Sequence, residues 1–183
     1  MGQEAELVGT GAPPRKFATN AVQMLRTVQG NTQALSQMAD QKASILMGAT
    51  FVVFSISVSR AVAGNLEWAL VVLALFSFMS SLCAVIAILP SIGSFGKTAA
   101  PPPNRLFFGH FAGRDEAEWG EEVLVRMEDE EAMFRMMLRD IHQNGQVLAR
   151  KKYRFLTLAY RMFIFGLFLT ILTFVFERFV LGS

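Results

Sequence analysis

The chain has 183 residues, of which 52% are hydrophobic and 17% charged, and its formal net charge is only +2. So small a net charge excludes the global basic field that proteins use to bind nucleic acid polymers. A chain of this length allows one domain or two small ones. Its 17 Phe exceed what a soluble domain of that size needs, and they gather in three apolar runs, which indicates membrane spans.

The N-terminal part is polar. Residues 1–14 are small and polar and contain Gly and Pro, which predicts a disordered leader rather than a signal peptide. From residue 15 to 42 apolar positions recur at helical spacing, interrupted only around Gly30, which predicts a cytoplasmic amphipathic helix. The polar face of this helix is mostly Gln, Asn and Thr, which indicates burial in an assembly.

Two apolar runs follow. Asp40 and Lys42 are the last charged residues before Arg60, and about 20 residues at a rise of 1.5 Å cross a bilayer core, so residues 43–63 are predicted to form a transmembrane helix. A turn at Gly64 and Asn65 leads to a second predicted transmembrane helix over 67–90, antiparallel to the first. Two buried helices of a soluble protein are the disfavoured alternative, because both runs are apolar on all faces. The single cysteine, Cys83, lies within the second run and cannot form an intramolecular disulfide.

Residues 91–154 have a different composition, with ten basic and ten acidic residues, and are predicted to face water. A linker over 98–103 ends in three prolines and favours an extended conformation. An aromatic motif follows over 104–111, and then a long helix with one apolar stripe begins at about Glu116. A third transmembrane helix is predicted over 155–177. The fold class is therefore an all-α integral membrane protein, with three transmembrane helices and a long-helix cytoplasmic stalk.

The basic residues also predict the orientation. They gather in the N-terminal helix and in 91–154, whereas the turn after the first span and the C-terminal end carry one each, Arg60 and Arg178. The positive-inside rule then places the N-terminus in the cytoplasm and the C-terminus outside. Three helices enclose no useful lumen, so a channel built from this chain would need several copies, and we expect a homo-oligomer in the lipid bilayer.

No arrangement of residues predicts catalysis. His110 and His142 are 32 residues apart with no second cysteine, so a zinc site is improbable, and no glycine-rich phosphate loop is present. Runs of acidic residues such as 128–131 are read as a solvated helix face or as partners of Arg126 and Arg135. We therefore predict no enzyme, no cofactor and no metal.

Two clusters are candidates for ligand binding. Aromatic side chains, glycine amides and arginines around 104–114 could hold a flat anionic ligand such as a nucleotide, with the basic cluster 150–154 helping to bind its phosphate. Alternatively, the aromatics plug the cytoplasmic mouth of the helices or lie among lipid headgroups, and the basic cluster sets the topology and contacts headgroups. The candidate ligand-binding residues are Asn104, Arg105, Phe107, Phe108, Arg114, Lys151 and Lys152.

A second set of charges meets at the membrane mouth, because the helices on either side of the stalk enter the bilayer at one depth. Asp40 is the acidic residue available to the basic cluster, so we predict that it pairs with Lys151, Lys152 or Arg154 of the same or a neighbouring copy. The residues of this set are Asp40, Lys42, Lys151, Lys152 and Arg154.

Three short motifs resemble those of the transmembrane Pycsar effector family: ADQKAS at 39–44, NRLFFG at 104–109 and ARKKY at 149–153. The order and spacing of the motifs agree over roughly residues 20–176. Carried over to this chain, the resemblance singles out Asp40, Lys42, Ser44, Asn104, Leu106, Phe107, Phe108, Gly109, Lys151, Lys152 and Tyr153.

The resemblance implies a role in bacterial antiphage defence. In this family a cyclase makes cyclic CMP or cyclic UMP, and the membrane effector responds by impairing the bacterial inner membrane. Some of these effectors sense the nucleotide through an appended cyclic-nucleotide-binding domain, and no β-barrel of that kind fits in this chain. The compact cytoplasmic part would then bind the ligand itself, between subunits, or the chain has another trigger. The alternative function is a non-enzymatic structural or assembly subunit of a larger membrane complex.

Overall fold

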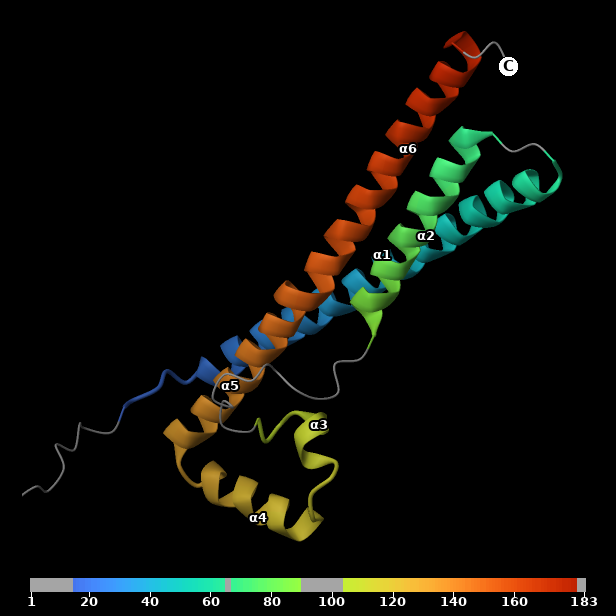
Figure 1. Ribbon diagram of the computed structural model, residues 1–183. Coiled ribbons are helices and arrows are strands. Elements are labelled where there is room, and N and C mark those ends of the chain that lie inside the picture. Colours follow the sequence, from blue (N-terminus) through green and yellow to red (C-terminus); the bar gives the residue numbers. More distant parts are fainter. Residues whose placement is uncertain (1–14, 65–66, 90–103, 181–183) are drawn as a thin grey trace, which may run out of the picture.

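The computed structural model describes residues 15–64, 67–89 and 104–180, and the regular structure of these residues is entirely helical (Figure 1). Three of the helices are long and apolar enough to cross a membrane, which confirms the predicted fold class. The predicted leader over 1–14, the linker over 98–103 and Asn65 of the predicted turn lie outside the described residues.

Helix α1 covers Ala21–Val62 and joins the predicted amphipathic helix to the first predicted span without interruption. The predicted start at residue 15 is too early by six residues, and the helix is continuous through Gly30, where the apolar pattern is interrupted. A single glycine costs a helix interior only about 1 kcal/mol, which the long flanking segments tolerate. Just past the end of α1, Gly64 has a φ of +89°, a conformation that glycine adopts without strain.

Helix α2, Trp68–Ile88, returns antiparallel to α1 and packs against both α1 and α6, Arg154–Val180, whereas α1 and α6 barely touch each other (Figure 1). The Glu177 carboxylate of α6 accepts hydrogen bonds from the backbone N–H of Trp68 at 2.7 Å and of Ala69 at 3.3 Å. A carboxylate at a helix N-terminus satisfies otherwise unpaired amides and matches the helix dipole. Helices α2 and α6 are thereby joined at the end far from the stalk.

The water-facing part contains α3, Phe108–Phe111, α4, Glu116–Met127, and α5, Glu130–Val147. The predicted single long helix from Glu116 is wrong, because the chain turns at residues 128–129. Asp129 is extended, and its side chain accepts a hydrogen bond from the Glu131 N–H at 3.0 Å, which starts α5 as a new helix. Consecutive acidic residues suit a helix N-terminus better than a helix interior, where their charges repel each other.

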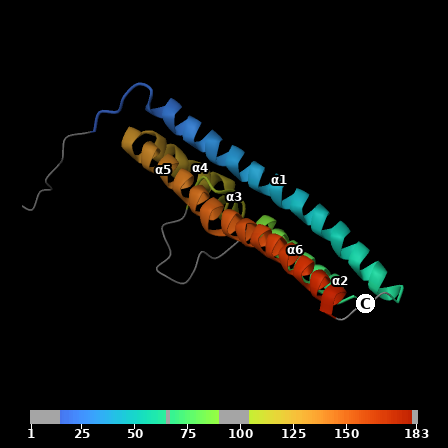
Figure 2. The same cartoon turned by 90° about the horizontal axis from the view of Figure 1, so that it is seen from above.

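Helix α5 continues through a π-helical segment, η1, Leu148–Tyr153, into α6, Arg154–Val180. This long rod and α1 run in the same direction, from the stalk towards the membrane end (Figure 2), and contact each other mainly along α5 and η1, whereas α6 and α1 diverge (Figure 1). The buried core lies where the stalk meets the spans and draws on α1, α2, η1 and α6. Its buried members are Ala39, Ala43, Leu46, Cys83, Ala84, Leu148, Leu156 and Ala159.

Candidate functional site

Asn104 is the centre of the aromatic motif, and it is buried, with only 1% of its surface exposed. Its side-chain amide donates to the Asp140 carboxylate of α5 at 2.9 Å, and its side-chain oxygen accepts from the Leu106 N–H at 3.1 Å. Gln29 of α1 donates to the other oxygen of Asp140 at 3.3 Å. Asp140 therefore links the aromatic motif to both rods of the stalk.

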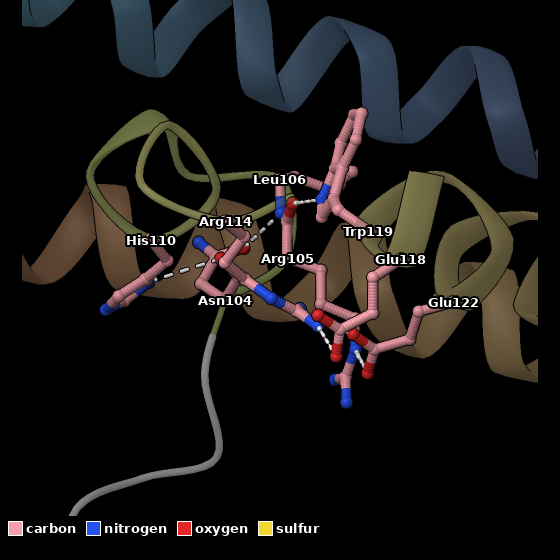
Figure 3. A network of polar contacts seen from close by, with 8 residues as sticks. All are labelled: Asn104, Arg105, Leu106, His110, Arg114, Glu118, Trp119 and Glu122. Carbon is pink, nitrogen blue, oxygen red and sulfur yellow. Dashed lines mark hydrogen bonds and ion pairs between the residues drawn. The ribbon is translucent and has the colours of Figure 1, made fainter. Parts of the chain in front are cut away.

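The two arginines of the motif are bound within the chain, as Figure 3 shows. Arg105 and Arg114 both pair with Glu122 of α4, the latter at 2.6 Å, and Arg114 also reaches Glu118 at 3.2 Å. Hydrogen bonds from Arg114 and then Arg105 hold the pKa of the Glu122 carboxyl below its usual value. These pairs hold α4 against the motif and neutralise the charge that a ligand phosphate would seek.

Aromatic contacts complete the fold of this region. The Trp119 indole N–H donates to the Arg105 carbonyl at 2.9 Å, and its ring stacks on Phe111 with centroids 4.9 Å apart. Phe107 packs against Phe108 with centroids 4.9 Å apart. A Cβ at Gly109 would meet the Phe107 ring, so glycine lets that ring fold back over the turn.

A groove of about 550 Å³ lies between α1, the aromatic motif and α5. One wall is the polar face of α1, and the facing wall is aromatic; Asp140, Asn144 and Lys152 contribute the remaining polar groups. Within the described residues, the side-chain amides of Gln33 and Gln37 make no hydrogen bond and are open to a ligand. The wall residues are Gln29, Thr32, Gln33, Ser36 and Gln37 on α1, and Leu106, Phe107, Phe108 and Phe111 opposite.

The π-helical segment η1 ties the rod to the other two membrane helices. Lys152 donates to the Asp40 carboxylate at 2.6 Å and to the Ser36 hydroxyl at 2.7 Å, both on α1. Its neighbour Lys151 donates to the Leu89 carbonyl, just past α2, at 2.6 Å. Lys152 thus lines the groove and also holds α1 at the membrane mouth.

Three other hollows near the motif suit a nucleotide less well. Small-molecule sites commonly measure about 300–1,000 Å³. The cavity beside Arg105, Arg114 and Trp119 has about 250 Å³, and the one beside Arg126, Arg135 and Arg139 has about 150 Å³. The fourth hollow carries three carboxylates, which would repel a phosphate; they belong to Glu121, Glu122 and Asp129.

Comparison with known proteins gives one decisive match. A family model of the Pycsar effector protein domain matches residues 23–177. The chain belongs to the Pycsar effector family. No curated protein and no solved structure gave a match.

Membership of the Pycsar effector family confirms the resemblance seen in the three motifs. It makes the protein a bacterial antiphage defence effector with a membrane-spanning domain. The match runs through α1, the aromatic motif and most of α6, so both walls of the groove and Asp40 with its lysine partner belong to the Pycsar effector domain.

The structure separates the seven predicted ligand residues into three groups. Phe107, Phe108 and Lys152 line the groove, whereas Asn104, Arg105 and Arg114 lie in the network that supports it. Lys151 binds the end of α2.

In the predicted mouth set, Asp40 meets Lys152 of the same chain. Lys42 and Arg154 are exposed and form no ion pair with the described residues.

Asp140, Gln29 and Trp119 are the important residues that sequence reasoning missed. Asp140 comes directly before the apolar Ile141 and reads as a solvent-facing charge beside the stripe of α5. Its 5% exposure depends on Asn104, which is 36 residues away in the chain. One signal was present for α1: its polar face carries amides and hydroxyls instead of charges, which is typical of a buried polar wall.

Proposed function

We propose that this Pycsar effector responds to a cyclic pyrimidine nucleotide, cyclic CMP or cyclic UMP, bound in the groove, and that the response impairs the integrity of the bacterial inner membrane. It acts as a non-enzymatic homo-oligomer with its N-terminus in the cytoplasm and its C-terminus in the periplasm. The single observation that carries the proposal is the groove of about 550 Å³ that joins an aromatic wall, an amide wall and a lysine.

The chemistry of the groove fits a pyrimidine nucleoside and one phosphodiester charge. A base can stack on Phe107 or Phe108, since every base offers a π-face to an aromatic side chain. Asp140 and the amides of Gln33 and Gln37 offer the acceptors and donors that a Watson–Crick edge requires. The ammonium of Lys152, at the membrane end of the groove, supplies the cation for the cyclic phosphate.

Lys152 also gives the proposal its mechanism. Its ammonium is shared between Asp40 and Ser36. A phosphate in the groove competes with Asp40 for that ammonium and so weakens the tie between α1 and the α5–α6 rod. A ligand that binds the separated arrangement more tightly by a few kcal/mol shifts the population towards it. Because α1 continues directly into the first span, a change in its packing reaches the membrane.

A reconstituted system tests the proposal. The full-length protein in detergent would be titrated with cyclic UMP, cyclic CMP and, as a control, cyclic AMP. The same protein in liposomes that carry a membrane potential would report its loss through a voltage-sensitive dye. We expect the pyrimidine nucleotides to bind and to dissipate the potential, and the purine nucleotide to do neither.

Variants connect the response to the groove. Phe108→Leu removes a stacking surface and should weaken nucleotide binding about 5–100-fold, since base stacking contributes about 1–3 kcal/mol. Leu124→Ala is the matched control, because Leu124 is similarly exposed, at 56% against 55%, and lies outside the groove. An unchanged potential together with no detectable binding would contradict the nucleotide response. Co-purification of different membrane proteins in fixed ratio would favour the structural-subunit alternative.

A further inference from the structure

The cytoplasmic half of α1 is apolar on the side that faces water. Its groove side carries Gln29, Thr32 and Ser36, whereas large apolar side chains point away from the rest of the chain. The exposed fractions of these side chains are 61% for Met24, 42% for Val28, 44% for Leu35 and 48% for Met38. A water-soluble helix normally has the opposite arrangement, with its apolar side inward. This face of α1 is therefore expected to pack against another apolar surface.

The exposed face follows a strict heptad pattern. From residue 24 to residue 59, steps of four and three residues alternate without a break, and every position reached is exposed. Such 3.5-residue spacing is the signature of a helix that packs along its length on another helix. The positions of this stripe, hereafter the α1 stripe, are Met24, Val28, Asn31, Leu35, Met38, Lys42, Ile45, Ala49, Val52, Ile56 and Ser59.

Lipid cannot cover the cytoplasmic half of the stripe. Helix α1 runs straight out of the first span (Figure 2), and Met24 lies 18 residues before Lys42, about 27 Å along the helix axis. The apolar side chains there stand in water beyond the headgroup region. Within the span, lipid or protein can cover the stripe, and the heptad spacing continues across the boundary unchanged.

We infer that the α1 stripe is the surface through which copies of this chain assemble, α1 against α1 in parallel. The bilayer gives every copy the same orientation and depth, so Leu35 of one copy meets Leu35 of the next. Between Arg26 and Asp40 the helix carries no charge, so identical faces meet there without electrostatic repulsion. A self-complementary face of this kind is what a symmetric assembly of one chain requires.

The size of the stripe is sufficient for a stable contact. It extends over 36 residues, from Met24 to Ser59, about 52 Å of helix. Its seven large apolar side chains leave on the order of 700 Å² exposed per copy, close to the roughly 800 Å² per partner of a standard interface. Asn31, Lys42 and Ser59 are its polar positions, and single polar residues at such positions fix the register and number of helices in coiled coils.

The inference gives α1 two working faces. One wall of the ligand groove and the assembly interface are opposite sides of the same helix, so a change in the groove acts directly on the contacts between copies. The inference shares with the proposed function only the need for self-assembly, and nothing in it depends on a nucleotide. Between residues 43 and 58 the stripe consists of Ile45, Ala49, Val52 and Ile56, so in this arrangement the helices meet there without a polar path between them.

Cysteine cross-linking of the full-length chain in isolated membranes tests the interface. In a Cys83→Ala background, Val28→Cys and Leu35→Cys should give disulfide-linked dimers on mild oxidation, because identical positions on paired helices approach within disulfide range. Gln33→Cys is the matched control at the same height, because Gln33 is exposed on the groove side. We expect at least a fivefold higher dimer yield at residues 28 and 35 than at residue 33. Equal yields at the three positions, or none at 28 and 35, would overturn the interface.

A second measurement does not depend on disulfide geometry. Leu35→Asn should lower the particle mass in mild detergent towards that of a single chain, whereas Gln33→Asn should leave it unchanged; both variants should retain the helical circular dichroism of the wild type. A Leu35→Asn variant with the mass of the wild-type assembly would overturn the inference. If cross-linking at residues 28 and 35 were absent while the nucleotide response was intact, only the proposed interface would be contradicted. If cross-linking occurred as expected but no nucleotide response was found, only the proposed function would be contradicted.

Discussion

Lys152 of η1 and Asp40 of α1 lie 2.6 Å apart and join the two rods of the stalk where both approach the membrane. Their side chains are 19% and 39% exposed, so the pair is only partly shielded from water. Its position gives it importance beyond its energy, because it closes the membrane end of the groove and holds the helix that continues into the first span. A modest change in this pair can therefore redistribute the packing of the stalk.

A double-mutant cycle should measure the strength of this pair. We expect Asp40→Asn and Lys152→Gln each to lower stability and the double variant to show a coupling free energy of about 0.5–1 kcal/mol, as for partly exposed ion pairs. Thermal unfolding in detergent gives the stabilities. Arg154→Gln is the control, because Arg154 is exposed and forms no ion pair with the described residues. Strictly additive effects of the two substitutions would show that the pair contributes nothing.

The buried pair of Asn104 and Asp140 allows an exchange experiment. Asn104→Asp places a second carboxylate against Asp140 and should cost about 2–4 kcal/mol, since like charges are forced together out of water. The combination of Asn104→Asp with Asp140→Asn again pairs one amide donor, now at residue 140, with one carboxylate acceptor, now at residue 104, and should recover most of the loss. Hydrogen exchange of the amides between residues 104 and 122 reports the local opening. If the double variant opened as readily as Asn104→Asp alone, the two side chains would not act as a pair.

The parts of this structure that sequence predicted depend on runs of neighbouring residues. The spans follow from charge-free intervals, and Asp40 could be matched to the basic cluster because both were placed at one membrane depth. The turn at Asp129 was missed because four consecutive acidic residues suit either an exposed helix face or a helix N-terminus. Only the hydrogen bond that the Asp129 side chain accepts from the Glu131 N–H decides between these two structures.

The interior of the stalk was beyond sequence reasoning for another reason. The partners of Arg105 and Arg114 are on α4, and the partner of Asn104 is on α5. Helical periodicity identifies which side of α4 or α5 is apolar, but it does not identify the loop that folds against that side. The motif residues were consequently expected to contact a ligand directly, whereas Asn104 and the arginines are engaged by Asp140, Glu118 and Glu122.

Acid should loosen the aromatic motif through Glu122. Its pKa is lower in the folded state than in the unfolded state, where it is about 4.3, so the folded state binds fewer protons. The stabilisation is complete above about pH 4.3 and is lost as the pH falls through the lower folded value. Fluorescence of Trp119 in a Trp68→Phe background should show this loss as the pH falls below about 4.3.

Glu122→Gln should remove that pH dependence and loosen the motif already at pH 7, because the glutamine cannot neutralise two arginines. Glu121→Gln is the matched control, one residue away, exposed and without an ion pair among the described residues. A Glu122→Gln variant with the acid transition of the wild type would assign the transition to another carboxylate.

Helices α2 and α6 should depend on Gly166 for their close packing. A Cβ at this position would overlap the Cβ of Phe76 in α2, and the Ser80 hydroxyl of α2 donates to the Ala159 carbonyl of α6 at 2.8 Å in the same interface. Small residues allow such close approach of helices in membranes. Gly166→Ala should therefore destabilise the protein by about 1–3 kcal/mol, the usual cost of overpacking.

Gly48→Ala is the control for this substitution, because it lies in the span of α1 with no atom within 4 Å of an added Cβ. There the gain in helix propensity of up to about 1 kcal/mol should appear without a clash. Thermal unfolding of the two variants in one detergent gives the comparison. Equal stabilities of the two alanine variants would contradict the prediction. In that case α2 and α6 could move apart without a loss of stability, and their interface would not require Gly166.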